Sequence, residues 1–491
     1  MSDKEIRTYD VVVIGAGPVG ENVADRTRAA GLSTVIVESE LVGGECSYWA
    51  CEPSKALLRP VLLYREAARF PGVAAAVTGP LDAGAVLKHR DRMAADWNDQ
   101  DQVDWLGSVG VDLLRGHGRL DGPRRVTVHT PEGDTMRLIA RHAVAVCTGT
   151  AAALPPLPGL DAVRPWTSRE AASAREVPDR LAILGAGVVA TEMAAAWQAL
   201  GARVTLIARE SRLLGRVEAF AADLVAEGLR EAGVQLRFGT TITAAERAGG
   251  PDDGIHLTLA DGTRLVADEL LLATGRAPRT EDIGLDTVGL SPGQWLTTDD
   301  TFTVTAVDGD WLYAVGDVNH RALLTHQGKY QARVAGSVIA ARAQGLALDT
   351  GRWGRHVGTA DLEAVPQVVF TDPEIAAVGL TTEDAARAAR DVDVVDYDIG
   401  RAAGAIQHDP GYRGRARVLI DPQRQVIVGA TFAGPGVAEL LHSATIAITG
   451  EIPIDRLWHA VPPFPTISEV WLRLLETYRD QQNSSVAGEI G

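Results

Sequence analysis

Short apolar runs that end in glycine recur along the chain. The first run, Asp10-Val-Val-Val-Ile14, leads into Gly15, Gly17 and Gly20, then into a helical stretch and a second run, Thr34-Val-Ile-Val-Glu38. A short run of β-branched and aliphatic residues bounded by a turn signal is typical of a buried strand. The pattern therefore predicts a strand–helix–strand unit at the start of the chain.

The same plan returns in the second third of the chain. The run Leu181-Ala-Ile-Leu184 leads into Gly185, Gly187 and Ala190, then through an alanine-rich helical stretch to Arg203-Val-Thr-Leu-Ile-Ala208. Ala208 follows Gly185 at the same offset as Glu38 follows Gly15. Two units of matched spacing predict two dinucleotide sites.

The remaining pattern completes an α/β chain. Two more apolar runs, Leu270–Gly275 and Trp311–Asp317, end in or near glycine, as strands do where the backbone approaches a ligand. From about residue 357 the character changes to alternating strands, such as 416–420 and 425–430, and to helical stretches. We therefore predict two Rossmann-like dinucleotide-binding domains followed by a C-terminal α+β domain.

Composition narrows the class of protein. The chain has 491 residues, a 46% hydrophobic content and a formal charge of -17, which is typical of a multidomain globular protein. No block of lysines or arginines offsets the negative charge, which argues against nucleic acid as a partner. The N-terminal MSDKEIRTYD has no apolar core for a secretory signal, and charged residues interrupt the long apolar stretch 181–208. We expect a cytoplasmic protein without a membrane span.

Each glycine motif stands in the context that dinucleotide binding needs. Each follows a predicted strand, opens a predicted helix, and has a strand-end residue where the group that reads the ribose belongs. Glu38 can accept hydrogen bonds from both ribose hydroxyls, so the first site suits FAD or NAD. At the second site the equivalent residue is Ala208, followed by Arg209 and Arg212, whose guanidinium groups can bind a 2′-phosphate. This favours NADPH over NADH, unless the two arginines are ordinary solvated surface residues.

Two of the three cysteines, Cys46 and Cys51, lie five positions apart just after the Glu38 strand. Because thiols inside cells are kept reduced, a disulfide in such a chain is more readily catalytic than structural. A helix is predicted to begin at Pro53, and Lys55 follows two residues later. A thiol near a helix N-terminus and a lysine has its pKa drawn below the free value of ~8.5. The third cysteine, Cys147, sits in an apolar run and is predicted to be a core residue.

The segment GGECSYWACEPSK at residues 43–55, together with both glycine motifs, resembles the FAD-dependent pyridine nucleotide-disulfide oxidoreductases. This family includes dihydrolipoamide dehydrogenase, glutathione reductase and mercuric reductase. Further motifs in the family order are Thr274-Gly-Arg-Ala-Pro, Val315-Gly-Asp317, Val369-Phe-Thr-Asp-Pro-Glu374 and Phe464-Pro-Thr-Ile-Ser-Glu469.

The resemblance implies a homodimer and a division of the chain into domains. Residues 1–153 and 279–356 would form an FAD-binding domain in two segments, 154–278 an inserted NAD(P)H-binding domain, 357–480 an interface domain, and 481–491 a flexible tail. Hydride would pass from NADPH to FAD and then to a Cys46–Cys51 disulfide, with Cys51 against the flavin and Cys46 attacking the substrate. A dithiol can hold two electrons and pass them on by thiolate exchange.

The resemblance also assigns binding and catalytic residues. Lys55 would lie near the flavin and pair with Glu192, and Asp317 would bind the FAD ribitol. Glu469 would belong to the catalytic set. The residues that would contact FAD are Gly15, Gly17, Gly20, Glu38, Gly43, Gly44, Lys55, Gly118, Thr148, Gly149, Arg276, Gly316 and Asp317. Those that would contact the nicotinamide nucleotide are Gly185, Gly187, Ala190, Arg209, Arg212 and Gly275. No metal site is expected.

The chain departs from the family pattern at its C-terminus. Members that act on disulfides carry a histidine directly before the Pro-Thr of the last motif, paired with the following glutamate, whereas this chain has Phe464. Phenylalanine cannot move the proton that the substrate-attacking thiol gains and loses near neutral pH. His459, five residues before Phe464, either takes the place of the missing histidine or is an interface residue. Glu469 is either catalytic or structural.

The cysteine loop departs as well. Tyr48 and Trp49 stand where small or polar residues are usual, and they either pack under the helix or offer a surface to a flat acceptor. Glu52 disfavours a thiolate on Cys51 unless its side chain points to solvent.

Three functions remain open from the sequence. The leading one is an NADPH-dependent FAD disulfide oxidoreductase whose acceptor is a disulfide or another oxidised small molecule. The second is a quinone reductase or diaphorase in which the flavin passes electrons directly to a planar acceptor. The third is a redox-sensing flavoprotein of low turnover, or a tailoring protein that oxidises a dithiol. Mercuric reductase fits less well, because no second cysteine pair stands at the C-terminus.

Overall fold

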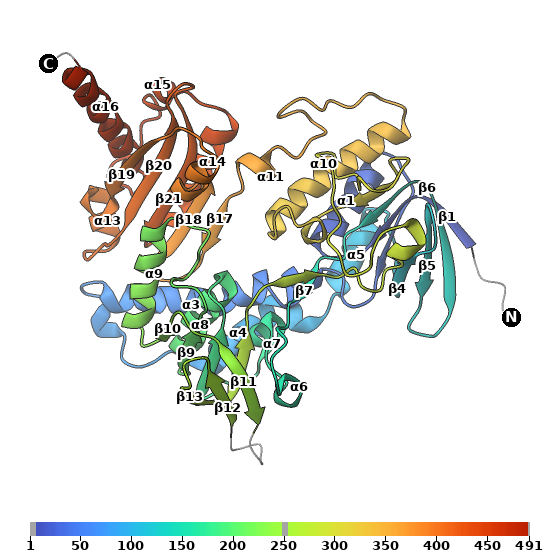
Figure 1. The fold of residues 1–491 in the computed structure, drawn as a ribbon, viewed down its shortest axis with the longest axis horizontal. Coiled ribbons are helices and arrows are strands. Elements are labelled where there is room, and N and C mark those ends of the chain that lie inside the picture. Colours follow the sequence, from blue (N-terminus) through green and yellow to red (C-terminus); the bar gives the residue numbers. More distant parts are fainter. Residues whose placement is uncertain (1–5, 248–253, 490–491) are drawn as a thin grey trace. The chain divides into compact units, whose positions relative to one another are not determined.

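The computed structural model describes residues 6–247 and 254–489, with side chains described up to residue 484. The chain forms two compact units (Figure 1). Unit 1 comprises residues 1–53, 91–153 and 276–362, and unit 2 comprises residues 54–90, 154–275 and 363–491. Helix α3, Cys51–Arg69, begins in the first range and continues in the second. Within the described residues, no helix combines the length and apolar character needed to cross a membrane.

Unit 1 is built on a seven-stranded sheet of order β3-β2-β1-β6-β5-β4, with β16 also paired to β6. The strands β3, β2, β1, β6 and β16 run parallel, and β5 and β4 are antiparallel additions. The strands of unit 1 are β1 (Ile6–Ile14), β2 (Thr34–Glu38), β3 (Asp112–Arg115), β4 (His117–Leu120), β5 (Arg125–His129), β6 (Thr135–Val146), β7 (Thr150–Ala152), β15 (Arg276–Pro278) and β16 (Leu312–Ala314).

Helices α1 (Pro18–Ala29), α5 (Gln100–Ser108) and α10 (Thr325–Ala343) pack on this sheet, and α10 lies against α1 (Figure 1). The core between them is apolar, with Val11, Val13 and Ile36 of the sheet fully buried. The helices are α1 (Pro18–Ala29), α2 (Gly44–Tyr48), α5 (Gln100–Ser108), α10 (Thr325–Ala343) and α11 (Ala360–Glu363), the last ending at the unit boundary. The apolar runs at the start of the chain therefore form β1 and β2 as predicted.

Unit 2 contains a four-stranded parallel sheet of order β10-β9-β8-β14 and a three-stranded antiparallel sheet, β11-β12-β13. These strands are β8 (Arg180–Leu184), β9 (Arg203–Ile207), β10 (Gln235–Arg237), β11 (Ile242–Arg247), β12 (Ile255–Leu259), β13 (Arg264–Ala267) and β14 (Glu269–Leu272). The helices are α3, α4 (Ala83–Met93), α6 (Leu160–Val163), α7 (Ser168–Ser173), α8 (Val188–Ala199) and α9 (Ala219–Glu231).

The C-terminal part of unit 2 is a five-stranded antiparallel sheet, β17-β18-β21-β20-β19, with helices around it. Its elements are β17 (Gln367–Val369), β18 (Glu374–Gly379), α12 (Thr382–Arg387), β19 (Asp393–Asp398), α13 (Ala403–His408), β20 (Arg415–Asp421), β21 (Val426–Gly434), α14 (Leu441–Thr449), α15 (Ile454–Leu457) and α16 (Glu469–Glu489). The predicted α+β character of this region is confirmed. Helix α16 ends at Glu489, within the segment 481–491 that is predicted to be a tail.

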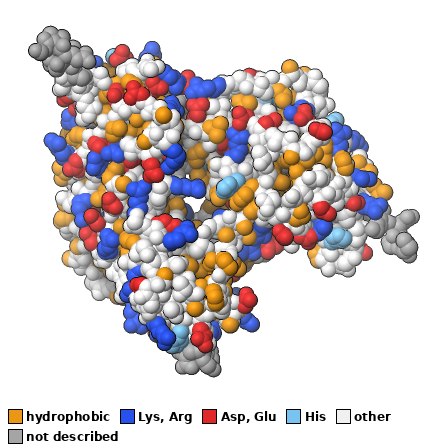
Figure 2. All heavy atoms as spheres, viewed as in Figure 1, with side chains coloured by type: hydrophobic (Ala, Val, Ile, Leu, Met, Phe, Trp, Pro, Cys, Tyr) orange, Lys and Arg blue, Asp and Glu red, His pale blue; other side chains and the backbone are white. Residues whose placement is uncertain are grey.

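Charged side chains are intermixed on the surface. On the face shown in Figure 2, Lys and Arg side chains alternate with Asp and Glu across the described residues.

Candidate active site

The two cysteines lie on consecutive helices. Cys46 is on the short helix α2, and Cys51 is the first residue of α3, which begins two residues before the predicted Pro53. Both are partly buried, and neither forms a disulfide in this structure. The Cys51 Sγ lies 3.2 Å from the Thr325 Oγ1, at the start of α10. A thiol at the first position of a 19-residue helix faces the positive end of the helix dipole.

The pKa of the Cys46 thiol differs from the lowered value that the sequence predicts for a thiol in this loop. A hydrogen bond with the Cys51 side chain, together with burial, raises the pKa of the Cys46 thiol. The charge of Glu52 adds to the increase although its side chain is exposed, and the hydrogen bond with Thr325 opposes it. The expected lowering of a thiol pKa in this loop therefore does not extend to Cys46, because proximity to a second thiol and loss of water outweigh it.

The aromatic residues of the loop have different surroundings. Tyr48 is 1% exposed, and its hydroxyl donates to the Val42 carbonyl at 3.0 Å and accepts from the Gln102 amide at 3.1 Å. The Trp49 ring lies edge-on to the Tyr48 ring, with centroids 5.7 Å apart. Tyr48 is thus a packing residue of unit 1, and Trp49 is the partly exposed member of the pair.

Lys55 and Glu192, which are far apart in the sequence, meet in unit 2. The Lys55 Nζ lies 2.8 Å from one carboxylate oxygen of Glu192, and the other oxygen accepts the Phe370 backbone N–H at 3.0 Å. The Lys55 ammonium also lies 5.1 Å from the centre of the Phe370 ring. Glu192 is only 3% exposed, so the pair is a partly buried, charge-assisted contact that fixes the direction of Lys55.

The first glycine motif has the close packing that a dinucleotide site requires. Gly17 caps α1, and a Cβ there would meet no atom closer than 4.0 Å. In contrast, a Cβ on Gly20 would overlap the Gly15 carbonyl oxygen. Gly44, at φ +56°, approaches Gly17 so closely that a Cβ on Gly44 would lie 2.9 Å from the Gly17 Cα. The first turn of α1 therefore begins among closely packed glycines, which lets a ligand approach the backbone at a helix N-terminus, where a phosphate is favoured.

Glu38 ends β2 beside this motif. It is 9% exposed, and its two oxygens accept the backbone N–H groups of Ala16 at 2.6 Å and Glu40 at 2.7 Å. Since a carboxylate oxygen has more than one acceptor site, these bonds orient Glu38 and leave capacity for ribose hydroxyls. Gly43 donates to the Ala16 carbonyl at 2.7 Å, and this bond ties the cysteine loop to the motif.

The other residues predicted to bind FAD in unit 1 fit a polar group. The Thr148 hydroxyl is buried and has no hydrogen-bond partner among the described residues. The neighbouring Gly149 has open space where a Cβ would stand. Because buried hydroxyls in native proteins are normally bonded, Thr148 fits a site completed by a ligand.

Asp317 follows β16. Burial raises the pKa of its carboxyl, while a 2.8 Å hydrogen bond from Thr150 and the charge of Arg276 oppose the increase. Arg276 itself donates to Thr150 at 2.5 Å. A buried acid with this support suits a ligand hydroxyl, as predicted for a ribitol. Gly316 directly precedes Asp317. Gly118 lies in β4, where a Cβ would stand 3.1 Å from a methyl group of Val37.

The second glycine motif has the same geometry in unit 2. Gly185 at φ +140° has no room for a Cβ beside the Ala273 carbonyl, whereas Gly187 caps α8 with open space around it. Ala190 and Ala208 are both fully buried. Gly275, at φ +139°, follows β14.

The two arginines after Ala208 are not equivalent. The Arg209 side chain is 84% exposed and pairs at 3.3 Å with Glu210, which is next to it in sequence. The Arg212 side chain is 34% exposed and lies 3.1 Å from a carboxylate oxygen of Glu383, on α12. Arg212 thus already has an anionic partner at the place where a 2′-phosphate was predicted.

The C-terminal motif gives Glu469 a structural set of bonds. Its carboxylate accepts from the Arg473 guanidinium at 2.6 and 3.0 Å and from the Ala403 backbone N–H at 3.2 Å. Phe464 is 76% exposed, and His459 is exposed just after α15. None of the bonds of Glu469 involves His459.

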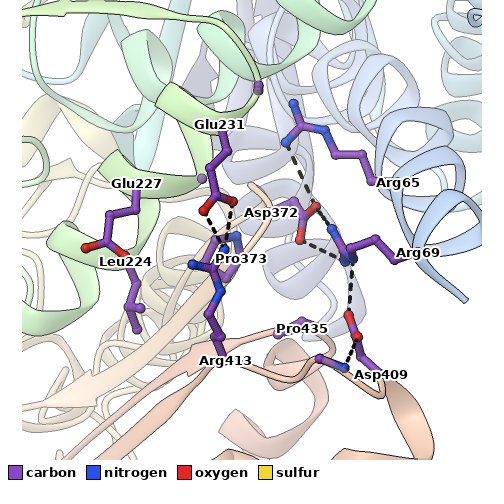
Figure 3. A pocket seen from close by; sticks show the side chains of 13 residues that line it. Arg65, Arg69, Leu224, Glu227, Glu231, Asp372, Pro373, Asp409, Arg413 and Pro435 are labelled. Atoms are coloured by element: carbon purple, nitrogen blue, oxygen red, sulfur yellow. Dashed lines mark hydrogen bonds and ion pairs between the residues drawn. The ribbon is translucent and has the colours of Figure 1, made fainter.

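A cavity of about 340 Å³ lies in unit 2 along the C-terminal half of α3 (Figure 3). Arg69 donates to both oxygens of Asp372 and also, at 3.2 Å, to Asp409. Arg413 pairs with Glu231 on α9 at 2.7 Å. Most charged side chains that line the cavity are thus paired with one another. The ion pairs of Arg69 stabilise the position of α3 and leave little unpaired charge to bind a ligand.

The sequence did not indicate several polar residues that contact the predicted site residues within each unit. Thr325, Thr150 and Glu383 contact Cys51, Asp317 and Arg212, respectively. Arg279, in unit 1, binds Glu45 of α2 at 2.8 Å. Each pair joins segments far apart in the chain, and no local pattern marks such partners.

Comparison with known proteins supports the family assignment. The profile of the pyridine nucleotide-disulphide oxidoreductases matches residues 9–345, and that of their dimerisation domain matches residues 365–474. Dihydrolipoyl dehydrogenase 3 of Pseudomonas aeruginosa is 33% identical over 94% of this chain and 96% of its own length. Mercuric reductase of Staphylococcus aureus is 29% identical over 94% of this chain and 81% of its own length.

Solved structures agree in fold. The flavoprotein disulfide reductase RclA of Escherichia coli superimposes with a TM-score of 0.80 over 96% of this chain and 99% of its own, at 22% identity. LpdA of Mycobacterium tuberculosis gives the same score over 95% and 99%, at 25% identity. The predicted fold class is confirmed. The chain belongs to the pyridine nucleotide-disulphide oxidoreductases, enzymes that use FAD and a pyridine nucleotide.

Proposed function

We propose that the protein passes two electrons from NADPH through FAD to the Cys46–Cys51 pair and on to an oxidised small molecule, with a disulfide as the leading acceptor. The observation that carries the proposal is the pair itself: two thiols in hydrogen-bonding contact, with Cys51 at the start of α3. When bound, FAD supplies two-electron transfer between a nicotinamide and a disulfide. Its binding residues are those of the first glycine motif, Glu38, Thr148 and Asp317.

The two cysteines would act in sequence. The Cys46 thiolate attacks one sulfur of the acceptor, which breaks the acceptor's S–S bond, forms a mixed disulfide and releases one thiolate. Cys51 then attacks the Cys46 sulfur, releases the second thiolate and restores the Cys46–Cys51 bond. Each released thiolate takes a proton from solvent. The acceptor is thereby reduced by two electrons, and the dithiol is oxidised.

The raised pKa of Cys46 sets the pH dependence of this step. At neutral pH Cys46 is mostly a thiol, so the thiolate fraction increases as pH rises toward the thiol pKa. With Phe464 in the last motif, no imidazole at that position removes the proton. We therefore expect turnover with a disulfide acceptor to rise steadily from pH 6 to pH 9.

NADPH as the donor rests on the second site. Ala208 presents no carboxylate to repel a 2′-phosphate, and Arg209 and Arg212 follow it. Replacing both arginines with alanine should raise the KM for NADPH far more than that for NADH. Equal changes in both KM values would contradict the assignment.

A homodimer is part of the proposal, supported by the match of residues 365–474 to the family's dimerisation domain. Apolar side chains are exposed in this region, including Val461 at 82%, Phe464 at 76% and Ile446 at 50%. Exposed apolar groups of this size commonly mark interfaces. Sedimentation equilibrium of the FAD-loaded protein should give twice the chain mass of 52.0 kDa.

An acceptor screen tests the proposed function. Steady-state oxidation of NADPH would be measured with disulfides, quinones and metal ions, for the wild type and for Cys46→Ser. The proposal predicts that the substitution abolishes activity with disulfides and spares activity with quinones. Equal disulfide activity in both proteins would contradict it. If only quinones are reduced, direct electron transfer from the flavin is favoured. If the flavin is reduced rapidly but none of the tested acceptors is turned over, a redox sensor is favoured.

A further inference from the structure

Glu21 is a partly buried carboxyl that the function described so far does not use. It follows Gly20 directly and lies in the first turn of α1. Its Oε1 is buried and has no hydrogen-bond partner among the described residues. A buried polar atom without a partner costs free energy, so native proteins retain one chiefly where a ligand, a water molecule or a functional role accounts for it.

The charged and titratable groups around Glu21 come from three other elements. Lys329 of α10 favours the charged form of Glu21, and Glu38 of β2 disfavours it. The charge of Glu21 also raises the pKa of Tyr48 of α2. Glu38 and Tyr48 are already bonded elsewhere, as described above. Because loss of water dominates, the pKa of Glu21 is raised to about 7.

The second glycine motif shows that this feature is not required by the fold. Thr191 follows Ala190 as Glu21 follows Gly20, and it is also buried. Its hydroxyl donates to the Gly187 carbonyl at 2.9 Å, so the position is satisfied within the helix. A small hydroxyl therefore serves at this place in α8, and the carboxyl in α1 needs a separate explanation.

The place of Glu21 suggests one. Its surroundings are the first turn of α1, the end of β2 and helix α2, which are the segments predicted to contact FAD. The start of α1 favours an anion such as the FAD pyrophosphate. An ionised Glu21 would put a second negative charge in the same turn, whereas a protonated Glu21 has no charge and an O–H group to donate.

We propose that Glu21 makes FAD binding proton-linked: the protein binds FAD tightly when Glu21 is a neutral acid and more weakly when it is ionised. The inference rests on the proposed FAD site. Binding at neutral pH then takes up a proton from solvent onto the Glu21 carboxyl. No oxidation or bond exchange is involved. Lower pH favours retention of FAD, and higher pH favours its release.

The experiment measures FAD binding to the FAD-free protein from pH 5.5 to pH 8.5, by the change in flavin fluorescence. We expect the wild-type dissociation constant to increase at least fivefold between pH 6 and pH 8. Glu21→Gln should bind as tightly as the wild type does at pH 6, with little dependence on pH. Asp25→Asn is the matched control, since it removes a more exposed charge one turn further along α1 and should keep the wild-type pH dependence.

Calorimetry of the unsubstituted protein gives a second test that needs no variant. Titration with FAD at pH 7.5, in two buffers of different ionisation enthalpy, should reveal proton uptake on binding. No uptake, a flat wild-type profile, or an unchanged profile in Glu21→Gln would each overturn the proposal. Failure of the protein to bind FAD at any pH would instead contradict the FAD site itself.

Discussion

The two strand–helix–strand segments, 10–38 and 181–208, share one backbone plan but differ in the side chains that are predicted to contact a nucleotide. The first ends in Glu38, which is held by two backbone N–H groups, and the second ends in the buried Ala208. The first has glycine at position 20, where the second has Ala190. The spacing of the glycines thus predicts that a nucleotide binds, and we expect the residues between and after the glycines to select which nucleotide.

A second difference concerns polar groups inside the first helical turn. Thr191 satisfies its own hydroxyl within α8, whereas Glu21 leaves a carboxyl oxygen without a partner. Glu192, the next residue in α8, is committed to Lys55 and Phe370. Helix α8 therefore supports a lysine on α3, and helix α1 keeps a titratable group beside its predicted ligand.

The largest effect on stability and FAD binding is expected when Gly20, the third glycine of the first motif, is replaced by the alanine that the second motif has at Ala190. In Gly20→Ala, the new Cβ would overlap the Gly15 carbonyl oxygen, and the Val13 side chain lies 3.3 Å from the same point. We expect the free energy of unfolding to fall by about 1–3 kcal/mol, together with loss of bound FAD. Chemical denaturation and the flavin absorbance of the purified protein measure both.

The reverse substitution, Ala190→Gly, is the matched control. It should cost about 1 kcal/mol through the lower helix propensity of glycine, with FAD retained. If Gly20→Ala were as stable as the wild type and kept its FAD, the close approach in the first motif would not be required.

The next largest effect, on nucleotide preference, is expected when Ala208 is replaced by a glutamate like Glu38 of the first strand–helix–strand segment. Ala208→Glu should repel a 2′-phosphate and offer an acceptor to a free 2′-hydroxyl. We expect kcat/KM for NADPH to fall about tenfold or more, equivalent to ~1.4 kcal/mol, and that for NADH to increase. Steady-state kinetics with one acceptor would show this switch. A parallel loss for both nucleotides would mean only that the buried site was disrupted.

A smaller effect is expected from the ion pair between Arg212 and Glu383. Glu383→Gln releases the Arg212 guanidinium, and a partly exposed pair of this kind is worth up to about 1 kcal/mol. The KM for NADPH should therefore fall about twofold to threefold, with no change for NADH. Glu231→Gln, which breaks the ion pair with Arg413 outside the nucleotide site, is the control. An unchanged KM for NADPH would show that Arg212 does not meet the 2′-phosphate.

The sequence predicts what depends on local pattern. The sequence predicts the strands β1, β2, β8 and β9 because apolar runs and glycine spacing are properties of neighbouring residues. The meeting of Lys55 with Glu192 was predicted only through the family resemblance, since 137 positions separate them. The start of α3 was placed two residues late, because Pro53 is equally compatible with the first turn of a helix and with its first residue.

Other features could not be read from the sequence because they depend on distant partners and on burial. Thr325 contacts Cys51 across 274 positions, and Glu383 contacts Arg212 across 171. The direction of the Cys46 pKa follows from its contact with Cys51 and from lost hydration, and neither is a property of the loop sequence alone. The same holds for Glu21, which in the sequence is indistinguishable from a solvated helix residue.

Anaerobic reductive titration of the FAD-loaded protein tests the central claim most directly. If Cys46 and Cys51 form a redox pair with the flavin, the wild type should take up about four electrons per FAD, two in the flavin and two in the disulfide. Cys46→Ser should take up about two. Uptake of only two electrons by both proteins would show that the cysteines do not exchange electrons with the flavin, and would contradict the account.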